Sequence, residues 1–172
     1  MELRFVAPQL RQLDGVGSEV LACCVFSDER PLRGLAGLID WRMAGRLSQW
    51  VEAGELRGER GEVVLIPGKP RIAFEKLILL GLGPRDAFDE RACRGSVETI
   101  LNILSGLRVR MAVVERPGRH LDDLDALRAV DAVLDACEGH QDQDILTLVE
   151  PPHEQKRIAQ HLAEERRRRR LR

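Results

Sequence analysis

The sequence predicts an α/β domain of three layers, in which helices cover both faces of a mostly parallel, twisted sheet. Short apolar segments alternate with amphipathic helical patterns over the second half of the chain, an order that implies right-handed crossovers between parallel strands. One run, Glu19–Phe26, is apolar after its first residue and is bounded by polar turns, which is typical of a buried strand. The 172 residues, 44% of them hydrophobic, suffice for a real core.

The first elements in chain order are an edge strand, the buried strand and a helix. Leu3–Ala7 is expected to form an edge strand that pairs beside the buried strand. Over residues 38–53 apolar side chains recur at steps of three and four, which predicts one amphipathic helix closed by Gly54. That periodicity puts both tryptophans, Trp41 and Trp50, on the inward face of the helix.

A hairpin and a second long helix follow. The strands Glu62–Ile66 and Lys76–Leu80 flank a Pro-Gly-Lys-Pro turn that is short enough for an antiparallel hairpin. Asp89 can cap a helix that runs to about Leu107 and turns an apolar face inward.

The remaining elements alternate strand and helix. They are the strand Arg110–Glu115, the helix Leu121–Cys137, the strand Asp144–Val149 and a final helix begun by Pro151-Pro152. We therefore divide the chain into an α/β domain at residues 1–150 and a C-terminal helix with a basic tail at residues 151–172.

Charge is distributed unevenly although the formal net charge is only −1. Residues 122–165 carry twelve acidic and three basic side chains, and a cluster of arginines follows: Arg166, Arg167, Arg168, Arg169, Arg170 and Arg172. This tail is the candidate contact for nucleic acid or for an acidic partner, because arginine clusters bind phosphates through counterion release. Two other interpretations stay open: a solvated helix end that favours the negative pole of the helix dipole, or docking on the acidic helix 122–135 of a second copy.

The run Leu79-Leu80-Gly81-Leu82-Gly83 raises the question of a dinucleotide-binding loop. The third glycine of that fingerprint is replaced by Asp86, whose carboxylate would repel a pyrophosphate. Pro84 removes an amide donor, although Glu115 stands at the end of the next strand, where a ribose-binding acid would lie. We therefore expect the two glycines to serve the backbone of a turn.

Other residue types with catalytic or metal-binding chemistry do not form a matching pattern. The histidines lack the spacing that lets two imidazoles hold one metal: His120, His140, His153 and His161. The cysteines show no Cys-x-x-Cys spacing and lie in apolar patterns: Cys23, Cys24, Cys93 and Cys137. We expect no catalytic residue, no metal site and no cofactor, and we expect a cytoplasmic protein with no membrane partner, since no long apolar stretch occurs.

Three segments in succession carry a resemblance to a known family. They are Gly34-Leu35-Ala36-Gly37-Leu38-Ile39-Asp40, then Glu55-Leu56-Arg57-Gly58-Glu59-Arg60-Gly61-Glu62, and then Leu79-Leu80-Gly81-Leu82-Gly83. Their order and spacing resemble the amino-terminal domain of the leucyl (cytosol) aminopeptidase family over roughly residues 20–107. The resemblance implies a macro-domain-like α/β/α fold.

The resemblance also bears on activity. The chemistry of that family lies in a carboxy-terminal domain with two metal ions and an Asn-Thr-Asp-Ala-Glu-Gly-Arg segment, which this sequence lacks. It therefore implies a stand-alone, non-catalytic domain that acts as a protein-interaction or regulatory module, as a detached subunit of a metallo-aminopeptidase, or through self-association. Nucleic-acid contact through the arginine tail is a further implication, since some members bind DNA.

The alternative function is a macro-like protein that binds or processes a small ligand such as ADP-ribose or another nucleotide. That function would use the crevice at the carboxyl ends of the strands. Asp28, near the end of an early strand, and the Gly15-Val16-Gly17 turn are the residues that suggest it.

Overall fold

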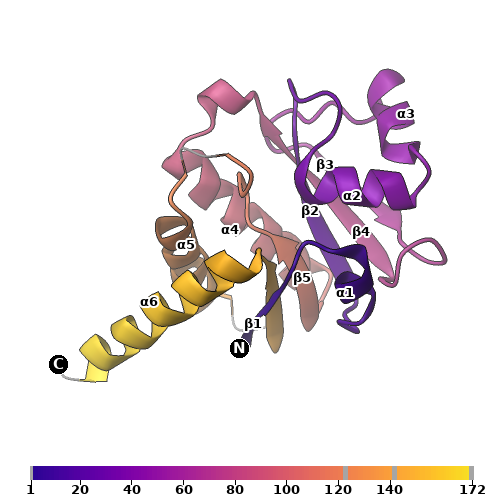
Figure 1. Ribbon diagram of the computed structural model, residues 1–172. Coiled ribbons are helices and arrows are strands. Elements are labelled where there is room, and N and C mark those ends of the chain that lie inside the picture. Colours follow the sequence, from indigo (N-terminus) through magenta and orange to yellow (C-terminus); the bar gives the residue numbers. More distant parts are fainter. Residues whose placement is uncertain (1, 122–123, 141–142, 171–172) are drawn as a thin grey trace.

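The computed structural model describes residues 2–121, 124–140 and 143–170, with the side chains of residues 165, 166 and 168–170 left out. In this part of the chain six strands form one sheet (Figure 1). The strands are β1 (Glu2–Val6), β2 (Val20–Phe26), β3 (Val63–Pro67), β4 (Lys76–Gly83), β5 (Met111–Glu115) and β6 (Ile145–Val149). The helices are α1 (Leu10–Asp14), α2 (Gly34–Arg42), α3 (Arg46–Glu52), α4 (Glu90–Gly106), α5 (Ala126–Glu138) and α6 (Pro152–Arg170), with a short 3₁₀ turn at Arg85–Ala87.

The strands follow the order β1-β6-β5-β2-β4-β3. The predicted hairpin is confirmed, because β3 runs antiparallel to β4, whereas β1–β6, β6–β5, β5–β2 and β2–β4 are parallel pairs. The predicted place of the first strand is wrong in one respect. β1 lies at an edge as expected, but its partner is β6, because β5 and β6 insert between it and β2.

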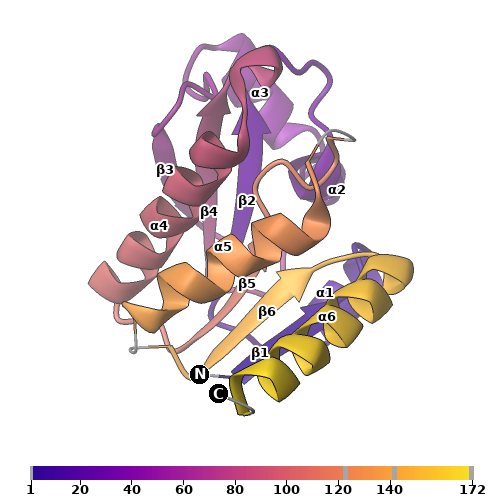
Figure 2. The same ribbon diagram turned by 90° about the vertical axis from the view of Figure 1, so that its left-hand side faces the viewer.

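The sheet separates two apolar cores (Figure 2). On one face α4, α5 and α6 pack over the sheet, with Ile158 of α6 fully buried. On the other face α1, α2 and α3 cover it. All seven residues of β2 are buried, because the strand lies in the middle of the sheet and alternate side chains enter opposite cores. The three-layer prediction is confirmed.

The single helix expected over residues 38–53 is wrong. The chain breaks between α2 and α3, where Ala44 and Gly45 take φ of 58° and 78°. Asp40 stabilises the new start, because its carboxylate accepts hydrogen bonds from the backbone N–H and the hydroxyl of Ser48 at 3.0 and 2.6 Å. The break also shifts the helix faces, so that Trp41 is 76% exposed instead of buried.

Two of the long helices after β4, α4 and α5, each begin at an aspartate that caps the first turn. Asp89 accepts a hydrogen bond from the N–H of Ala92 at 2.7 Å, which confirms the predicted cap of α4. The next helix starts later than the expected Leu121, because Asp125 caps α5 by accepting from the N–H of Leu127. Leu121 therefore precedes the helix and is free to line a cavity.

The four cysteines are free and buried, as their apolar surroundings predict. Burial raises the pKa of the Cys23 and Cys24 thiols well above the usual range, and the carboxylate of Glu115 adds to the shift. Both thiols are therefore protonated at neutral pH and fill core space.

Candidate functional site

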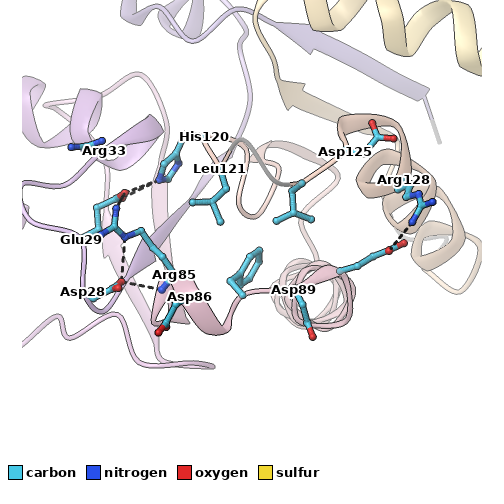
Figure 3. Close-up of a pocket in the computed structure, with 13 residues that line it drawn as sticks. Asp28, Glu29, Arg33, Arg85, Asp86, Asp89, His120, Leu121, Asp125 and Arg128 are labelled. Carbon is cyan, nitrogen blue, oxygen red and sulfur yellow. Dashed lines mark hydrogen bonds and ion pairs between the residues drawn. The ribbon is translucent and has the colours of Figure 1, made fainter.

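An open cavity of about 1020 Å³ lies at the carboxyl ends of the parallel strands (Figure 3). Its walls come from the loops that follow three neighbouring strands: Asp28 and Glu29 after β2, Arg85 after β4, and His120 after β5. In open α/β sheets this is the position at which ligands bind. The cavity is therefore the candidate functional site of this fold.

Glu29 and His120 form a pair in the cavity wall. His120 Nε2 lies 2.9 and 3.0 Å from the two carboxylate oxygens of Glu29, whose residue is only 4% exposed. The imidazole and the ring of Phe26 are nearly perpendicular, at 81°, with 5.6 Å between the centroids. His120 Nδ1 is buried, and the Cβ of any residue other than glycine at position 34 would come within 3.0 Å of it. Neither ring nitrogen is therefore placed to take a proton from a molecule in the cavity.

Glu115 occupies the N-terminal end of α2 from inside the protein. Its Oε1 accepts a hydrogen bond from the N–H of Leu35 at 2.9 Å, and its Oε2 accepts from the N–H of Cys24 at 3.1 Å. Arg119 lies 3.3 Å from Oε1. Gly34 is required here, since it has a φ of 60° and a Cβ would lie 2.6 Å from Glu115 Oε1. A helix N-terminus favours an anion, and the protein's own carboxylate takes that role at Leu35.

The cavity carries an excess of negative charge. Among the described residues its lining includes six carboxylates and three guanidinium groups: Asp28, Glu29, Asp86, Asp89, Glu90 and Asp125 against Arg33, Arg85 and Arg128. Arg85 is 3.6 Å from Asp28, and Arg128 is 3.4 Å from Glu90, so two of the three cations are already paired. A phosphorylated ligand would enter against this charge.

The glycines of the strand-end segment serve the backbone. A Cβ at Gly81 would overlap the carbonyl oxygen of Glu59, because the turn that contains Gly58 crosses directly over β4. Gly83 has a φ of 80° and donates its N–H to the Gly58 carbonyl. Close approach of two backbone segments accounts for the glycines without a phosphate.

The model of the cytosol aminopeptidase family, N-terminal domain, matches residues 20–141, well over half of the chain. The chain belongs to this family. A probable cytosol aminopeptidase of Pseudomonas syringae pv. tomato is 31% identical over 99 residues, which are 58% of this chain and 19% of that protein. The corresponding protein of Thermosynechococcus vestitus is 29% identical over 132 residues, 76% of this chain and 26% of the relative. This cytosol aminopeptidase N-terminal domain thus spans about a quarter or less of these two relatives.

Solved structures share the fold at low sequence identity. A mutant of tomato leucine aminopeptidase superposes with a TM-score of 0.62 at 14% identity, over 94% of this chain and 35% of that one. A macrodomain mutant of Oceanobacillus iheyensis gives a TM-score of 0.71 at 13% identity, over 96% and 93% of the two chains. A Trypanosoma brucei macrodomain in complex with ADP-ribose gives 0.69 at 16% identity, over 93% and 68%. The predicted macro-domain-like fold is therefore confirmed.

The residues that suggested ADP-ribose binding separate in the structure. Asp28 lines the cavity, whereas Gly15-Val16-Gly17 precedes β2 and lies at the opposite, amino end of that strand. The glycine turn cannot contribute to the same site as Asp28.

The arginine tail continues α6 away from the sheet (Figure 1). Arg167 is exposed. The side chains of Arg166, Arg168, Arg169 and Arg170, all of Arg172, and the acidic Asp122 lie outside the described residues. The tail as a contact for nucleic acid or an acidic partner stays a prediction.

The histidines bond separately, each to its own neighbours. His140 contacts the carbonyl of Ala136 and the side chain of Asn102, and His161 lies 2.7 Å from Asp131. Within the described ranges no three His, Cys, Asp or Glu side chains come together as a metal site requires. Over the same ranges, no helix combines the length and the apolar character needed to cross a bilayer.

Proposed function

We propose that this cytosol aminopeptidase N-terminal domain works in the cytoplasm as a non-catalytic interaction module. Its partner is the metal-dependent catalytic part of an aminopeptidase. The proposal is supported by the family match, which covers the N-terminal domain, and by relatives that extend far beyond the matched region. It is also supported by a surface suited to a protein partner.

That surface is the edge strand β3. Its exposed apolar side chains are the observation that supports the proposed function best. Val64 and Ile66 pack against the core beneath α2 and α3, so Val63 and Leu65 point to the opposite face of the sheet. Val63 is 41% exposed and Leu65 46% exposed. In the described structure β3 pairs with β4 on one side and ends the sheet on the other. An exposed edge with apolar side chains is a template for a partner strand.

The proposal predicts a complex that depends on Leu65. Sedimentation velocity at micromolar concentration, with the catalytic part of a cytosol aminopeptidase from the same organism, should show binding of the native chain. Leu65→Lys should weaken binding about tenfold or more, because a charge at an edge strand opposes pairing and an apolar contact is lost. Gln49→Lys, an equal charge change at an exposed position of α3, should bind like the native chain.

Two results would contradict this function. One is the absence of any complex with the native chain. The other is equal affinity of the Leu65→Lys and Gln49→Lys variants, which would place the contact elsewhere. Thermal unfolding of both variants checks that the domain remains folded.

The second candidate function is a small-ligand binder of macrodomain type. The cavity at the strand ends and the likeness to a macrodomain solved with ADP-ribose favour it. Its acidic lining and the position of Glu115 oppose a diphosphate ligand. We therefore place the interaction module first.

A further inference from the structure

A second, smaller cavity of about 400 Å³ lies beside the strand-end cavity, where β5 and β6 end and α6 begins. Arg116 and Arg119 reach it from the segment after β5. Glu150 reaches it from the end of β6, and Glu154 from the first turn of α6. Its volume falls within the range of roughly 300–1,000 Å³ of small-molecule sites.

Arg116 and Glu150 form an ion pair in the wall of this cavity. The side chains are 3% and 0% exposed, and Arg116 Nε lies 2.6 Å from Glu150 Oε1. One more polar atom of each side chain is buried without a hydrogen-bond partner among the described residues. These atoms are Arg116 Nη1 and Glu150 Oε2. Buried charged atoms with unused hydrogen-bonding capacity are costly, so both call for a partner.

Arg119 and Glu154 each pair with a different residue and likewise keep one buried polar atom unpaired. Arg119 Nη2 contacts Glu115, while its Nε is buried and unpaired. Glu154 Oε1 lies 2.7 Å from Arg157, while its Oε2 is buried and unpaired. Each of these four side chains thus has one buried polar atom without a partner in the described structure, and Arg119 and Glu154, 12% and 16% exposed, are the two that a molecule in the cavity can reach.

Only a ligand that has both acceptors and donors can pair with a guanidinium group and a carboxylate at the same time. A metal ion would serve the carboxylates and leave the guanidinium donors unpaired, whereas a phosphate would do the reverse. The charges of the wall balance, with Arg116, Arg119 and Arg157 opposite Asp125, Glu150 and Glu154. The matching ligand carries one positive and one negative group close together.

We propose that this cavity binds a free α-amino acid with an apolar side chain. The α-carboxylate accepts hydrogen bonds from Arg119, whose side chain is 12% exposed, and lies near the positive end of α6, a helix of 19 residues. The α-ammonium group donates to Glu154, whose side chain is 16% exposed. The side chain faces Leu121, Leu124 and Ala126, the apolar part of the lining. This site is separate from β3 and does not depend on the partner proposed above.

Isothermal titration calorimetry of the full chain with L-leucine tests the proposal. L-Leucine is expected to bind, and N-acetyl-L-leucine and L-leucinamide, each lacking one of the two charges, are expected to bind at least tenfold more weakly. Adenosine serves as an uncharged ligand with both donors and acceptors. Binding of adenosine without binding of L-leucine or another apolar amino acid would overturn the proposal, and so would no binding of any amino acid.

Variants at the edge of the cavity locate the site. Glu154→Gln and Arg119→Gln each remove one charge and should weaken L-leucine binding about tenfold or more. Glu164→Gln, an exposed position of α6, should leave binding unchanged. Thermal unfolding confirms that each variant is folded. Unchanged affinity in both cavity variants would place any bound amino acid elsewhere and would contradict the proposal.

Discussion

Replacement of Glu115 with alanine is expected to lower the free energy of unfolding by about 3–5 kcal/mol. The side chain is 1% exposed and accepts hydrogen bonds from the buried amides of Cys24 and Leu35. Without the carboxylate both amides lose their acceptor, and each unsatisfied buried group costs about 1–3 kcal/mol. Arg119, which is 12% exposed, also loses its ion-pair partner.

Urea unfolding followed by circular dichroism measures this loss. Glu98→Ala is the matched control, because Glu98 is exposed on α4 and its removal should change stability by no more than about 0.5 kcal/mol. A loss below about 1 kcal/mol in Glu115→Ala would show that Glu115 does not join β2, α2 and β5 as described.

Arg116→Met is expected to destabilise the domain by about 3–5 kcal/mol at neutral pH, because it leaves the Glu150 carboxylate buried and unpaired. The double variant Arg116→Met/Glu150→Leu should recover much of the loss, since it removes the isolated charge as well. Unfolding curves of both variants measure the difference. No recovery in the double variant would contradict a penalty caused by the unpaired charge.

The loss in Arg116→Met should also depend on pH. Burial raises the pKa of Glu150 above its usual value of 4.5 even though Arg116 opposes the shift, so removal of Arg116 should raise it further. A carboxyl whose pKa is raised by folding stabilises the folded state fully below its unfolded pKa. That contribution is lost as pH rises through the folded pKa. The variant should therefore be less destabilised near pH 4 than near pH 7, and an equal loss at both would contradict this explanation.

The fold could be predicted from the sequence because its strands are short apolar runs and its long helices have one apolar face. Asp89 signals the start of α4 by its residue type and place alone. The break between α2 and α3 carried no such signal, since the apolar period continues across Ala44 and Gly45. The partner of β1 depends on strands more than 100 residues away in sequence, and local patterns do not encode such pairings.

The site was less predictable than the fold. The sequence shows Glu115 as an acid at a strand end, but its bonds to Cys24 and Leu35 arise from packing between distant segments. Arg116 and Glu150 did leave a signal, because each directly follows the last residue of a strand. Charged residues at that place meet at one edge of a parallel sheet, and their pairing could have been sought there.

We infer that the strand-end crevice of this macro-domain-like fold is closed to anionic nucleotides by Glu115 and by the acidic loops. Isothermal titration calorimetry with ADP-ribose tests it most directly, with the Trypanosoma brucei macrodomain that was solved with ADP-ribose as a positive control. We predict no measurable binding of ADP-ribose to this chain at ligand concentrations up to about 1 mM, which corresponds to an affinity weaker than about −4 kcal/mol. A dissociation constant in the micromolar range, with one ligand per chain, would show that the crevice is open to anionic nucleotides.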